Sequence, residues 1–221
     1  QEGIFQALPF PVRITVMGGG NFGLALSLVL ARNQARTSSI PTTLLVRTQG
    51  VAEHVNSHRE HPQYLKGIKI PPCVHATADP KEALKDATYM IHAVPVQYTR
   101  KFLEKVVPHM PPGAPILSVS KGIETSSLML MNDILKETCG AGRSYAFLSG
   151  PSFAREIAMN QATAVVIASD DSSLANDFAE VLSSPSFRCF TSRDVVGVEV
   201  GGAVKNVIAL AAGMCEGLGL G

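Results

Sequence analysis

The chain alternates between short apolar runs and segments whose apolar residues recur at helical spacing. Runs of strand length lie at residues 12–17, 42–46, 88–94, 116–120, 145–149, 163–168 and 187–191. Helical spacing occurs at residues 21–32, 128–137 and 173–183, and a short helix is expected after Asp79, an N-cap residue with Glu82 as its capping-box partner. Because parallel strands need crossover connections, the alternation predicts an α/β fold. We expect a Rossmann-type, doubly wound and mostly parallel sheet covered on both faces.

The character of the sequence changes near its C-terminal end. The last strand-like run ends near Thr191, and residues 195–220 are apolar apart from a few polar positions. We expect this stretch to form a long buried helix. The pattern therefore divides the chain into an α/β domain, residues 1–192, and the start of a truncated all-α second domain, residues 193–221.

Composition and charge narrow the class of protein. Of the 221 residues, 46% are hydrophobic and 17% charged, so the chain can bury a core and disorder is excluded. The formal net charge is +1 and the basic residues are scattered, which gives no reason to expect a nucleic-acid partner. No stretch reaches the roughly 18 to 20 uninterrupted apolar residues of a membrane span. The four cysteines form no CxxC pair and indicate reduced thiols, and Gln1 indicates a longer precursor or a trimmed chain.

The first strand-to-helix connection carries a glycine pattern. Gly18, Gly20 and Gly23 fit G-x-G-x-x-G between a predicted strand and a predicted helix. The first glycine permits a tight turn, the second lets the backbone approach a pyrophosphate, and the third lets the helix pack on the sheet. Because a helix N-terminus favours phosphates, we expect these glycines, with Asn21 and Phe22, to hold a dinucleotide. The alternative is a purely structural turn.

The position expected to contact the ribose departs from the usual fingerprint. That fingerprint has Asp or Glu about 20 residues further on. This chain instead has Arg47 at the end of the second predicted strand and no acidic residue between the glycine turn and Glu53. An arginine there can pair with a 2′-phosphate, which favours NADP(H), but it can equally stack on adenine or face solvent. The sequence leaves NAD(H) and NADP(H) open.

Two lysines lie where a ligand would need them. Lys121 follows a predicted strand, at the carboxyl edge where parallel sheets bind ligands; the alternative is an exposed loop lysine. Lys205 lies inside the apolar C-terminal helix, where burying an unpaired ammonium is costly. Its side chain leans back over Gly201, beside Gly202, so we expect a hollow for a small polar substrate and a pKa of Lys205 lowered towards the range of proton transfer. The alternative is a lysine snorkelling at the rim of a helix pair.

Two further motifs are less specific. The turn Gly150-Pro-Ser-Phe-Ala154 lies between a strand and a helix, and its amides and the Ser152 hydroxyl could hold a carbonyl or ribose oxygen. It could also be no more than a tight helix start. His54, His58 and His61 have the spacing of one helical face, but no carboxylate motif accompanies them. We expect a solvated loop or a lid near the cofactor rather than a metal site.

Six landmarks together carry a resemblance to a known family. They are Gly18-Gly-Gly-Asn-Phe-Gly23, Tyr64-Leu-Lys-Gly67, His92-Ala-Val-Pro-Val-Gln-Tyr98, Ser120-Lys-Gly122, Gly150-Pro-Ser-Phe-Ala154 and Gly197-Val-Glu-Val-Gly-Gly-Ala-Val-Lys-Asn206. In this order, and over nearly the whole chain, they resemble the N-terminal domain of NAD(P)-dependent glycerol-3-phosphate dehydrogenase. Residues 45–47 and 93–97 resemble its plant and algal plastid branch in particular.

The resemblance implies reversible hydride transfer between NAD(P)H and dihydroxyacetone phosphate, giving sn-glycerol 3-phosphate for glycerophospholipid metabolism. It implies a homodimer when full length, with no membrane or nucleic-acid partner, in the cytoplasm or the plastid stroma. Lys205 matches the acid/base lysine, and Lys121 matches a lysine that contacts substrate and cofactor. Further substrate contacts are implied at Gly150, Ser152 and Asn206, and further cofactor contacts at Phe22, Tyr98 and Ala154.

The family's second domain supplies an aspartate and an Arg-Asn pair that this sequence lacks. We therefore expect residues 1–221 to bind dinucleotide but to turn over substrate poorly. One competing hypothesis is a dehydrogenase of similar layout for a 6-phosphogluconate-like or ketopantoate-like hydroxy acid, which would lack the combination of Ser120-Lys-Gly122 with the Gly150 turn. Another is a non-catalytic dinucleotide sensor, which would keep its function in Lys205→Ala, whereas an enzyme would lose turnover and keep cofactor affinity.

Overall fold

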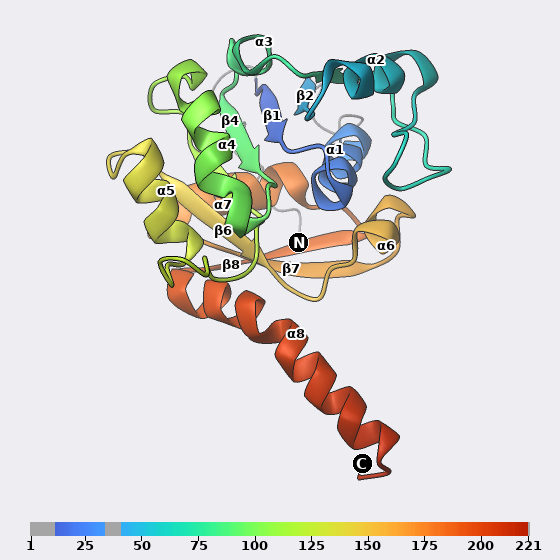
Figure 1. Ribbon diagram of the computed structural model, residues 1–221, viewed down its shortest axis with the longest axis vertical. Coiled ribbons are helices and arrows are strands. Elements are labelled where there is room, and N and C mark those ends of the chain that lie inside the picture. Colours follow the sequence, from blue (N-terminus) through green and yellow to red (C-terminus); the bar gives the residue numbers. More distant parts are fainter. Residues whose placement is uncertain (1–11, 34–40, 221) are drawn as a thin grey trace, which may run out of the picture.

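The computed structural model describes residues 12–33 and 41–220 and confirms the α/β architecture (Figure 1). Within these residues one sheet of eight strands has the order β3-β2-β1-β4-β5-β6-β7-β8. The strands are β1 (Ile14–Met17), β2 (Thr42–Leu45), β3 (Val74–Thr77), β4 (Tyr89–His92), β5 (Ile116–Ser118), β6 (Tyr145–Ser149), β7 (Thr163–Ala168) and β8 (Phe187–Ser192). Neighbouring strands run parallel except for the antiparallel pair β6 and β7, so the sheet is mostly parallel, as predicted.

Helices cover both faces of the sheet. They are α1 (Asn21–Asn33), α2 (Gln49–His58), α3 (Pro80–Leu84), α4 (Thr99–Val106), α5 (Met131–Cys139), α6 (Ala154–Ala158), α7 (Ser172–Leu182) and α8 (Val195–Gly217), with the 3₁₀ helices η1 (Val96–Tyr98) and η2 (Val107–His109). Strand side chains alternate between the two faces of the sheet. Val16 belongs to the hydrophobic cluster between the sheet and helices α1, α2, α6 and α7. Met17 belongs to the hydrophobic cluster between the sheet and helices α3, α4 and α5. The sequence analysis did not predict α2, β3 or α4, and it placed a helix after the Gly150 turn, where α6 lies.

The register of the central strands brings three connections to one edge of the sheet. Met17 at the end of β1 pairs with Leu45 of β2 and His92 of β4, and His92 pairs with Ser118 of β5. The glycine turn, the β2–α2 connection and the segment before Lys121 therefore leave the sheet side by side. The chain order reverses between β1 and β4, and ligands bind beyond the carboxyl ends of strands at such a point.

The start of α3 agrees with the sequence only in part. Asp79 caps this helix as predicted, because its side chain accepts a hydrogen bond from the Lys81 amide at 2.9 Å. The capping-box role of Glu82 is wrong. Its carboxylate instead accepts from the Thr77 hydroxyl at 2.5 Å and lies 3.4 Å from His75 Nε2, since both β3 side chains are within its reach.

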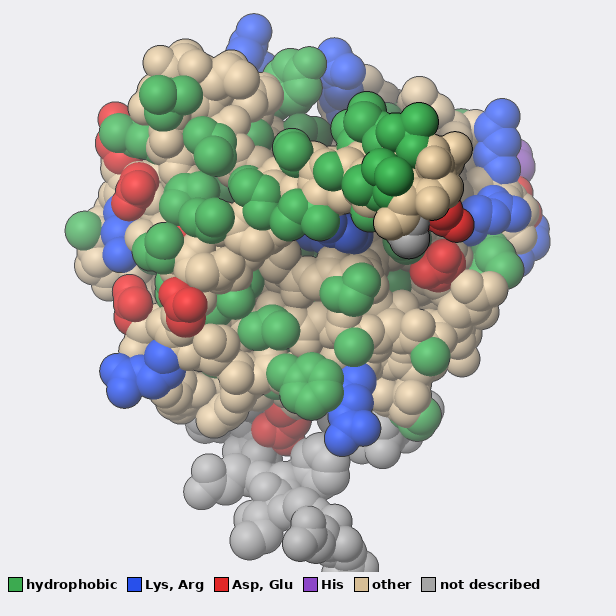
Figure 2. Space-filling model, turned by 90° about the horizontal axis from the view of Figure 1, so that it is seen from below, with side chains coloured by type: hydrophobic (Ala, Val, Ile, Leu, Met, Phe, Trp, Pro, Cys, Tyr) green, Lys and Arg blue, Asp and Glu red, His purple; other side chains and the backbone are tan. Residues whose placement is uncertain are grey.

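The expectation that α8 is buried is also wrong. Only Val195 is fully buried, and large apolar residues further on are open to solvent: Val207 is 67% exposed and Met214 65%. In Figure 1 the helix projects away from the sheet, and in the view from below hydrophobic side chains are gathered along it (Figure 2). Among the described residues, nothing packs against its distal half. By length and composition alone, Val195–Gly217 could cross a membrane.

Candidate functional site

The glycine turn between β1 and α1 has the geometry that its pattern predicts. Gly18 has a φ of +119°, and a Cβ atom there would lie 2.7 Å from the carbonyl oxygen of Ala93. A Cβ atom at Gly23 would collide with the carbonyl oxygen of Gly18, whereas nothing lies within 4 Å of that position at Gly20. Helix α1 begins at Asn21 and has no acidic residue in its first turn. The turn therefore leaves open backbone and an unopposed helix N-terminus, which suit a pyrophosphate.

The end of β2 lies beside this turn. The Gly18 amide donates to the Leu45 carbonyl at 3.0 Å, and Arg47 follows two residues later with an exposed side chain. The first carboxylate after the turn, Glu53, lies on α2 and accepts a hydrogen bond from Gln49 at 3.2 Å. At the end of β2, where a ribose would lie, the chain therefore has the guanidinium group of Arg47 and not a carboxylate.

Lys121 lies just beyond the carboxyl end of β5, as predicted. Its ammonium donates to the Gly150 carbonyl at 3.0 Å and to the Ser152 hydroxyl at 3.4 Å, and it lies 5.8 Å from the centroid of the Phe22 ring. Burial, together with the nearby charge of Lys205, lowers the pKa of Lys121. The Lys121 side chain therefore lies close to Phe22 of α1, to the Gly150 turn and to Lys205 of α8.

Lys205 is half-buried on α8, with its ammonium 4.7 Å from the centroid of the Phe153 ring. The hollow expected beside it exists, and Gly202 lines it, whereas Gly201 does not. A Cβ atom at Gly202 would lie 2.6 Å from Ser149 Oγ, so Gly202 serves to let α8 approach the end of β6. Gly201 faces open space.

The hollow is a cavity of about 380 Å³ between α8 and the ends of β5 and β6. It brings together five predicted site residues, including the aromatic Phe22, and a second aromatic ring, that of Phe153. Its lining residues are Phe22, Val119, Lys121, Gly122, Ser152, Phe153, Gly202, Ala203, Lys205 and Asn206. Two ammonium groups, a hydroxyl and an amide in one small cavity suit a polar, negatively charged molecule.

Three further predicted residues, Gly150, Ala154 and Tyr98, do not line this cavity. Gly150, with a φ of +149°, contributes its carbonyl to Lys121, and a Cβ atom there would lie 2.9 Å from the Ala164 carbonyl oxygen. Ala154 begins α6. Tyr98 is 66% exposed at the end of η1.

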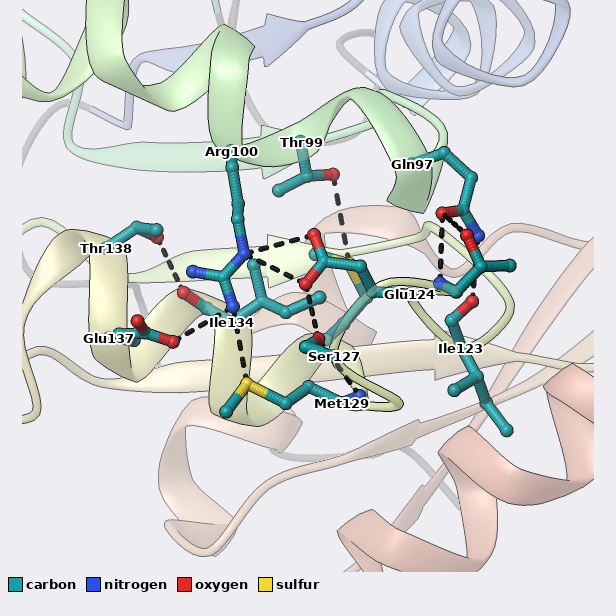
Figure 3. A network of polar contacts seen from close by, with 12 residues as sticks. Gln97, Thr99, Arg100, Ile123, Glu124, Ser127, Met129, Ile134, Glu137 and Thr138 are labelled. Carbon is teal, nitrogen blue, oxygen red and sulfur yellow. Dashed lines mark hydrogen bonds and ion pairs between the residues drawn. The ribbon is translucent and has the colours of Figure 1, made fainter.

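The segment that follows Lys121 is held by side chains from the β4–α4 connection (Figure 3). Gln97 donates to the Ile123 carbonyl at 2.8 Å, and its side-chain oxygen accepts from the Thr125 amide at 3.1 Å and from the Thr125 hydroxyl at 3.0 Å. The Gln97 side chain therefore forms hydrogen bonds with the backbone of Ile123 and of Thr125, the two neighbours of Glu124. The sequence analysis found Gln97 only as part of a landmark.

An ion pair completes this network. Arg100 Nε lies 3.0 and 2.9 Å from the two carboxylate oxygens of buried Glu124, which also accepts from the Ser127 hydroxyl at 2.5 Å. Nη2 of Arg100 donates a hydrogen bond to the carboxylate of Glu137 on α5 at 2.9 Å. Hydrogen bonds from Ser127 and Arg100 lower the pKa of Glu124. The sequence analysis missed this pair because its members are 24 positions apart.

A buried histidine supports Lys121 from the other side. His92 Nδ1 lies 3.1 Å from Ser120 Oγ, and the Ser120 hydroxyl donates to the Val94 carbonyl at 2.5 Å. The imidazole therefore donates from Nδ1, and its Nε2 lies 3.4 Å from the Thr99 hydroxyl. Burial lowers the pKa of His92 to about 4, so the ring is neutral. A polar residue closing an apolar strand was the sequence feature that could have revealed this role.

The three spaced histidines do not form the solvated loop that was one of the two expectations. His54 and His58 lie on α2, and their rings stack with centroids 4.3 Å apart. His61 follows the helix, and its Nδ1 accepts from the amides of Gln63 and Tyr64 at 3.1 and 3.0 Å. Burial lowers the pKa of His61. Within residues 12–33 and 41–220, no cluster of three His, Cys, Asp or Glu residues could hold a metal.

Known proteins share both the sequence and the arrangement. The chain is 42% identical over 210 residues to a chloroplastic glycerol-3-phosphate dehydrogenase [NAD(+)] of Arabidopsis thaliana, which covers 95% of this chain and 49% of that protein. It is 43% identical over 211 residues to a glycerol-3-phosphate dehydrogenase [NAD(P)+] of Nitratidesulfovibrio vulgaris, covering 95% of this chain and 62% of that one. The chain thus spans about half to three fifths of these relatives.

A solved structure and two family models agree with these relatives. The crystal structure of glycerol-3-phosphate dehydrogenase from Coxiella burnetii superposes with a TM-score of 0.84 and 31% identity, covering 96% of this chain and 63% of that one. The model of the NAD-dependent glycerol-3-phosphate dehydrogenase N-terminus matches residues 13–175, and that of the C-terminus matches residues 194–221. The chain therefore belongs to the NAD-dependent glycerol-3-phosphate dehydrogenase family.

Proposed function

We propose that this chain is the dinucleotide-binding and lysine-bearing part of a glycerol-3-phosphate dehydrogenase. The observation that carries the proposal is the convergence of Lys121 and Lys205 on one cavity, next to the Phe22 ring of the glycine-turn helix. The substrate class is dihydroxyacetone phosphate and sn-glycerol 3-phosphate. A cavity of about 380 Å³ with two ammonium groups fits a small phosphorylated molecule in size and charge.

The residues present fit a nicotinamide dinucleotide. The open backbone at Gly20 and the α1 N-terminus at Asn21 would hold the pyrophosphate, with Gly18 and Gly23 giving the turn its shape. Tyr98 and Ala154 would border the cofactor further along the edge. When bound, the nicotinamide supplies or accepts the hydride.

Each polar side chain of the cavity has a role in the proposed reaction. Lys205 would hold the proton that the substrate oxygen takes up on reduction and returns on oxidation. Lys121 would orient the substrate oxygens, since the Gly150 carbonyl and the Ser152 hydroxyl fix its ammonium. Ser152 and Asn206 would donate to the same molecule. The Gly150 carbonyl is engaged by Lys121, which supports an indirect contribution to substrate binding.

For the cofactor preference, we propose that Arg47 pairs with the 2′-phosphate of NADP(H). Its exposure and the missing carboxylate at the end of β2 support this. We also propose that residues 1–192 form the cofactor domain and residues 193–221 begin the helical one, in a homodimer of the cytoplasm or plastid stroma. The exposed apolar length of α8 supports burial against further protein.

Titration of residues 1–221 with NADH and with NADPH, followed by nucleotide fluorescence, tests the proposal. Saturable binding of either cofactor is expected, with NADPH tighter. Lys205→Ala should keep this binding while abolishing any dihydroxyacetone phosphate-dependent oxidation of NAD(P)H. Absence of saturable binding would overturn the dinucleotide role, and unchanged oxidation in Lys205→Ala would overturn the role of that lysine. Full turnover by residues 1–221 would show that the second domain is dispensable.

A further inference from the structure

Helix α5 begins without a cap of its own. The first amides of a helix have no partner within it and are usually satisfied by the N-cap side chain. Here the N-cap residue is Leu130, whose side chain makes no capping bond. The acceptor comes from another helix: Glu199 of α8 accepts a hydrogen bond from the Asn132 amide at 2.9 Å. A residue 67 positions away therefore does the work of a cap.

This carboxylate is held in a partly desolvated place. One of its oxygens, Oε2, is buried and has no hydrogen-bond partner among the described residues. Burial raises the pKa of Glu199 to about 7, and the charge of Asp133 adds to this. The amides of Asn132 and Met131 and the charge of Lys136 act in the opposite direction. Burying a carboxylate oxygen without a partner costs free energy, so stability alone does not account for this contact.

The contact lies in the short part of α8 that touches the rest of the chain. Val195 and Val198 pack in the same cluster as α5, and Gly202 lies against the end of β6. Beyond Asn206 every described residue of α8 is exposed. Lys205 is six residues after Glu199, about 9 Å along the helix axis. A change in the angle between the axes of α8 and α5 would therefore displace Lys205 from the cavity.

We propose that Glu199 is a positioning residue for Lys205: by capping α5 from α8, it fixes the direction of α8 and so the place of the Lys205 ammonium over the cavity. That the position of the Lys205 ammonium matters for reduction of a substrate rests on the proposed function. The docking itself depends only on the contacts between the two helices. Leu130 leaves the capping position of α5 to Glu199, and the small residue at Gly202 permits the second contact.

Three variants test the proposal in residues 1–221. Glu199→Ala removes the acceptor, Glu199→Gln retains one, and Glu216→Ala is the control on an exposed glutamate of the same helix. Hydrogen exchange of the Asn132 amide and of residues 198–206 reports docking. Exchange should be at least about tenfold faster in Glu199→Ala, while the sheet is unchanged and Glu199→Gln resembles the wild type.

A second measurement separates positioning from simple stabilisation. Burial and the charge of Lys205 lower the pKa of Lys121, and Gly202 of α8 lies beside the Lys121 side chain. NMR titration of ¹³C-methylated lysines should therefore show that pKa rising in Glu199→Ala and not in Glu216→Ala. Should Glu199→Ala fail to fold, Glu199→Asp, one methylene too short to reach α5, takes its place. Unchanged exchange and unchanged Lys121 titration would overturn the proposal. Neither readout uses cofactor or turnover, so the proposed function can fail independently.

Discussion

The buried imidazole of His92 makes the fold sensitive to acid. Burial lowers its pKa from 6.5 to about 4, and the side chain is 0% exposed at the end of β4. Between these values the unfolded chain binds a proton that the folded chain does not, so the free energy of unfolding falls as the pH falls through 6.5, and the loss levels off below about pH 4. At about 1.36 kcal/mol per pH unit the whole loss is about 3 kcal/mol, of which about 2 kcal/mol falls between about pH 7 and pH 5.

Urea unfolding of the wild type and of His92→Gln across this pH range measures the effect. Glutamine keeps a polar side chain but takes up no proton, so the variant should be less stable at neutral pH and should lose about 2 kcal/mol less on acidification. His109→Gln is the matched control, because His109 is exposed on η2. Parallel stability curves for the wild type and His92→Gln would refute the reasoning, since the folded and unfolded chains would then protonate His92 equally.

Four other substitutions have expected outcomes. Gly23→Ala should destabilise the chain by about 1–3 kcal/mol in urea unfolding and weaken NADH binding, because its methyl group meets the backbone of the glycine turn, whereas Gly20→Ala should fold normally and lose only binding. Arg100→Met leaves buried Glu124 without its cation and should cost about 2 kcal/mol by denaturation; a stability equal to wild type would contradict the clamp. Arg47→Ser should weaken NADPH binding about tenfold by fluorescence titration and spare NADH; equal losses for both cofactors would count against a 2′-phosphate contact.

The features that could be predicted from the sequence have a local physical cause. The glycine turn is predictable because backbone at positive φ and close helix packing both exclude side chains, and Gly18 and Gly23 meet those conditions. The position of Lys121 follows from the end of a strand in a parallel sheet. The elements that the sequence analysis missed include two polar ones: two of the four residues of β3, His75 and Thr77, are polar, and α2 has only Val51, Ala52 and Val55 to mark an apolar face.

What could not be predicted depends on residues distant in sequence. The apolar pattern of α8 predicts a buried helix, but a pattern does not show whether this chain supplies the cover, and the described residues leave Val207 and Met214 exposed. The pairing of Arg100 with Glu124 and the capping of α5 by Glu199 arise from the packing of separate helices. No spacing along the chain carries that information.

Two titratable groups near the candidate cavity, buried His92 and half-buried Glu199, have opposite effects on stability as the pH changes. His92 supports the Lys121 segment, and its contribution to stability is lost as the pH falls from 6.5 towards about 4. Glu199 docks the helix of Lys205, and because its pKa is raised from 4.5 to about 7, its contribution is complete below 4.5 and is lost as the pH rises through 7. Between about pH 4.5 and 6.5 the gain from His92 and the loss from Glu199 therefore nearly cancel as the pH rises, so that total stability changes little while the better-held side of the cavity shifts from Lys205 to Lys121. Acid loosens the Lys121 side of the cavity first, and alkali loosens the Lys205 side, so hydrogen exchange should locate the change in β4 and β5 in one case and in α8 in the other.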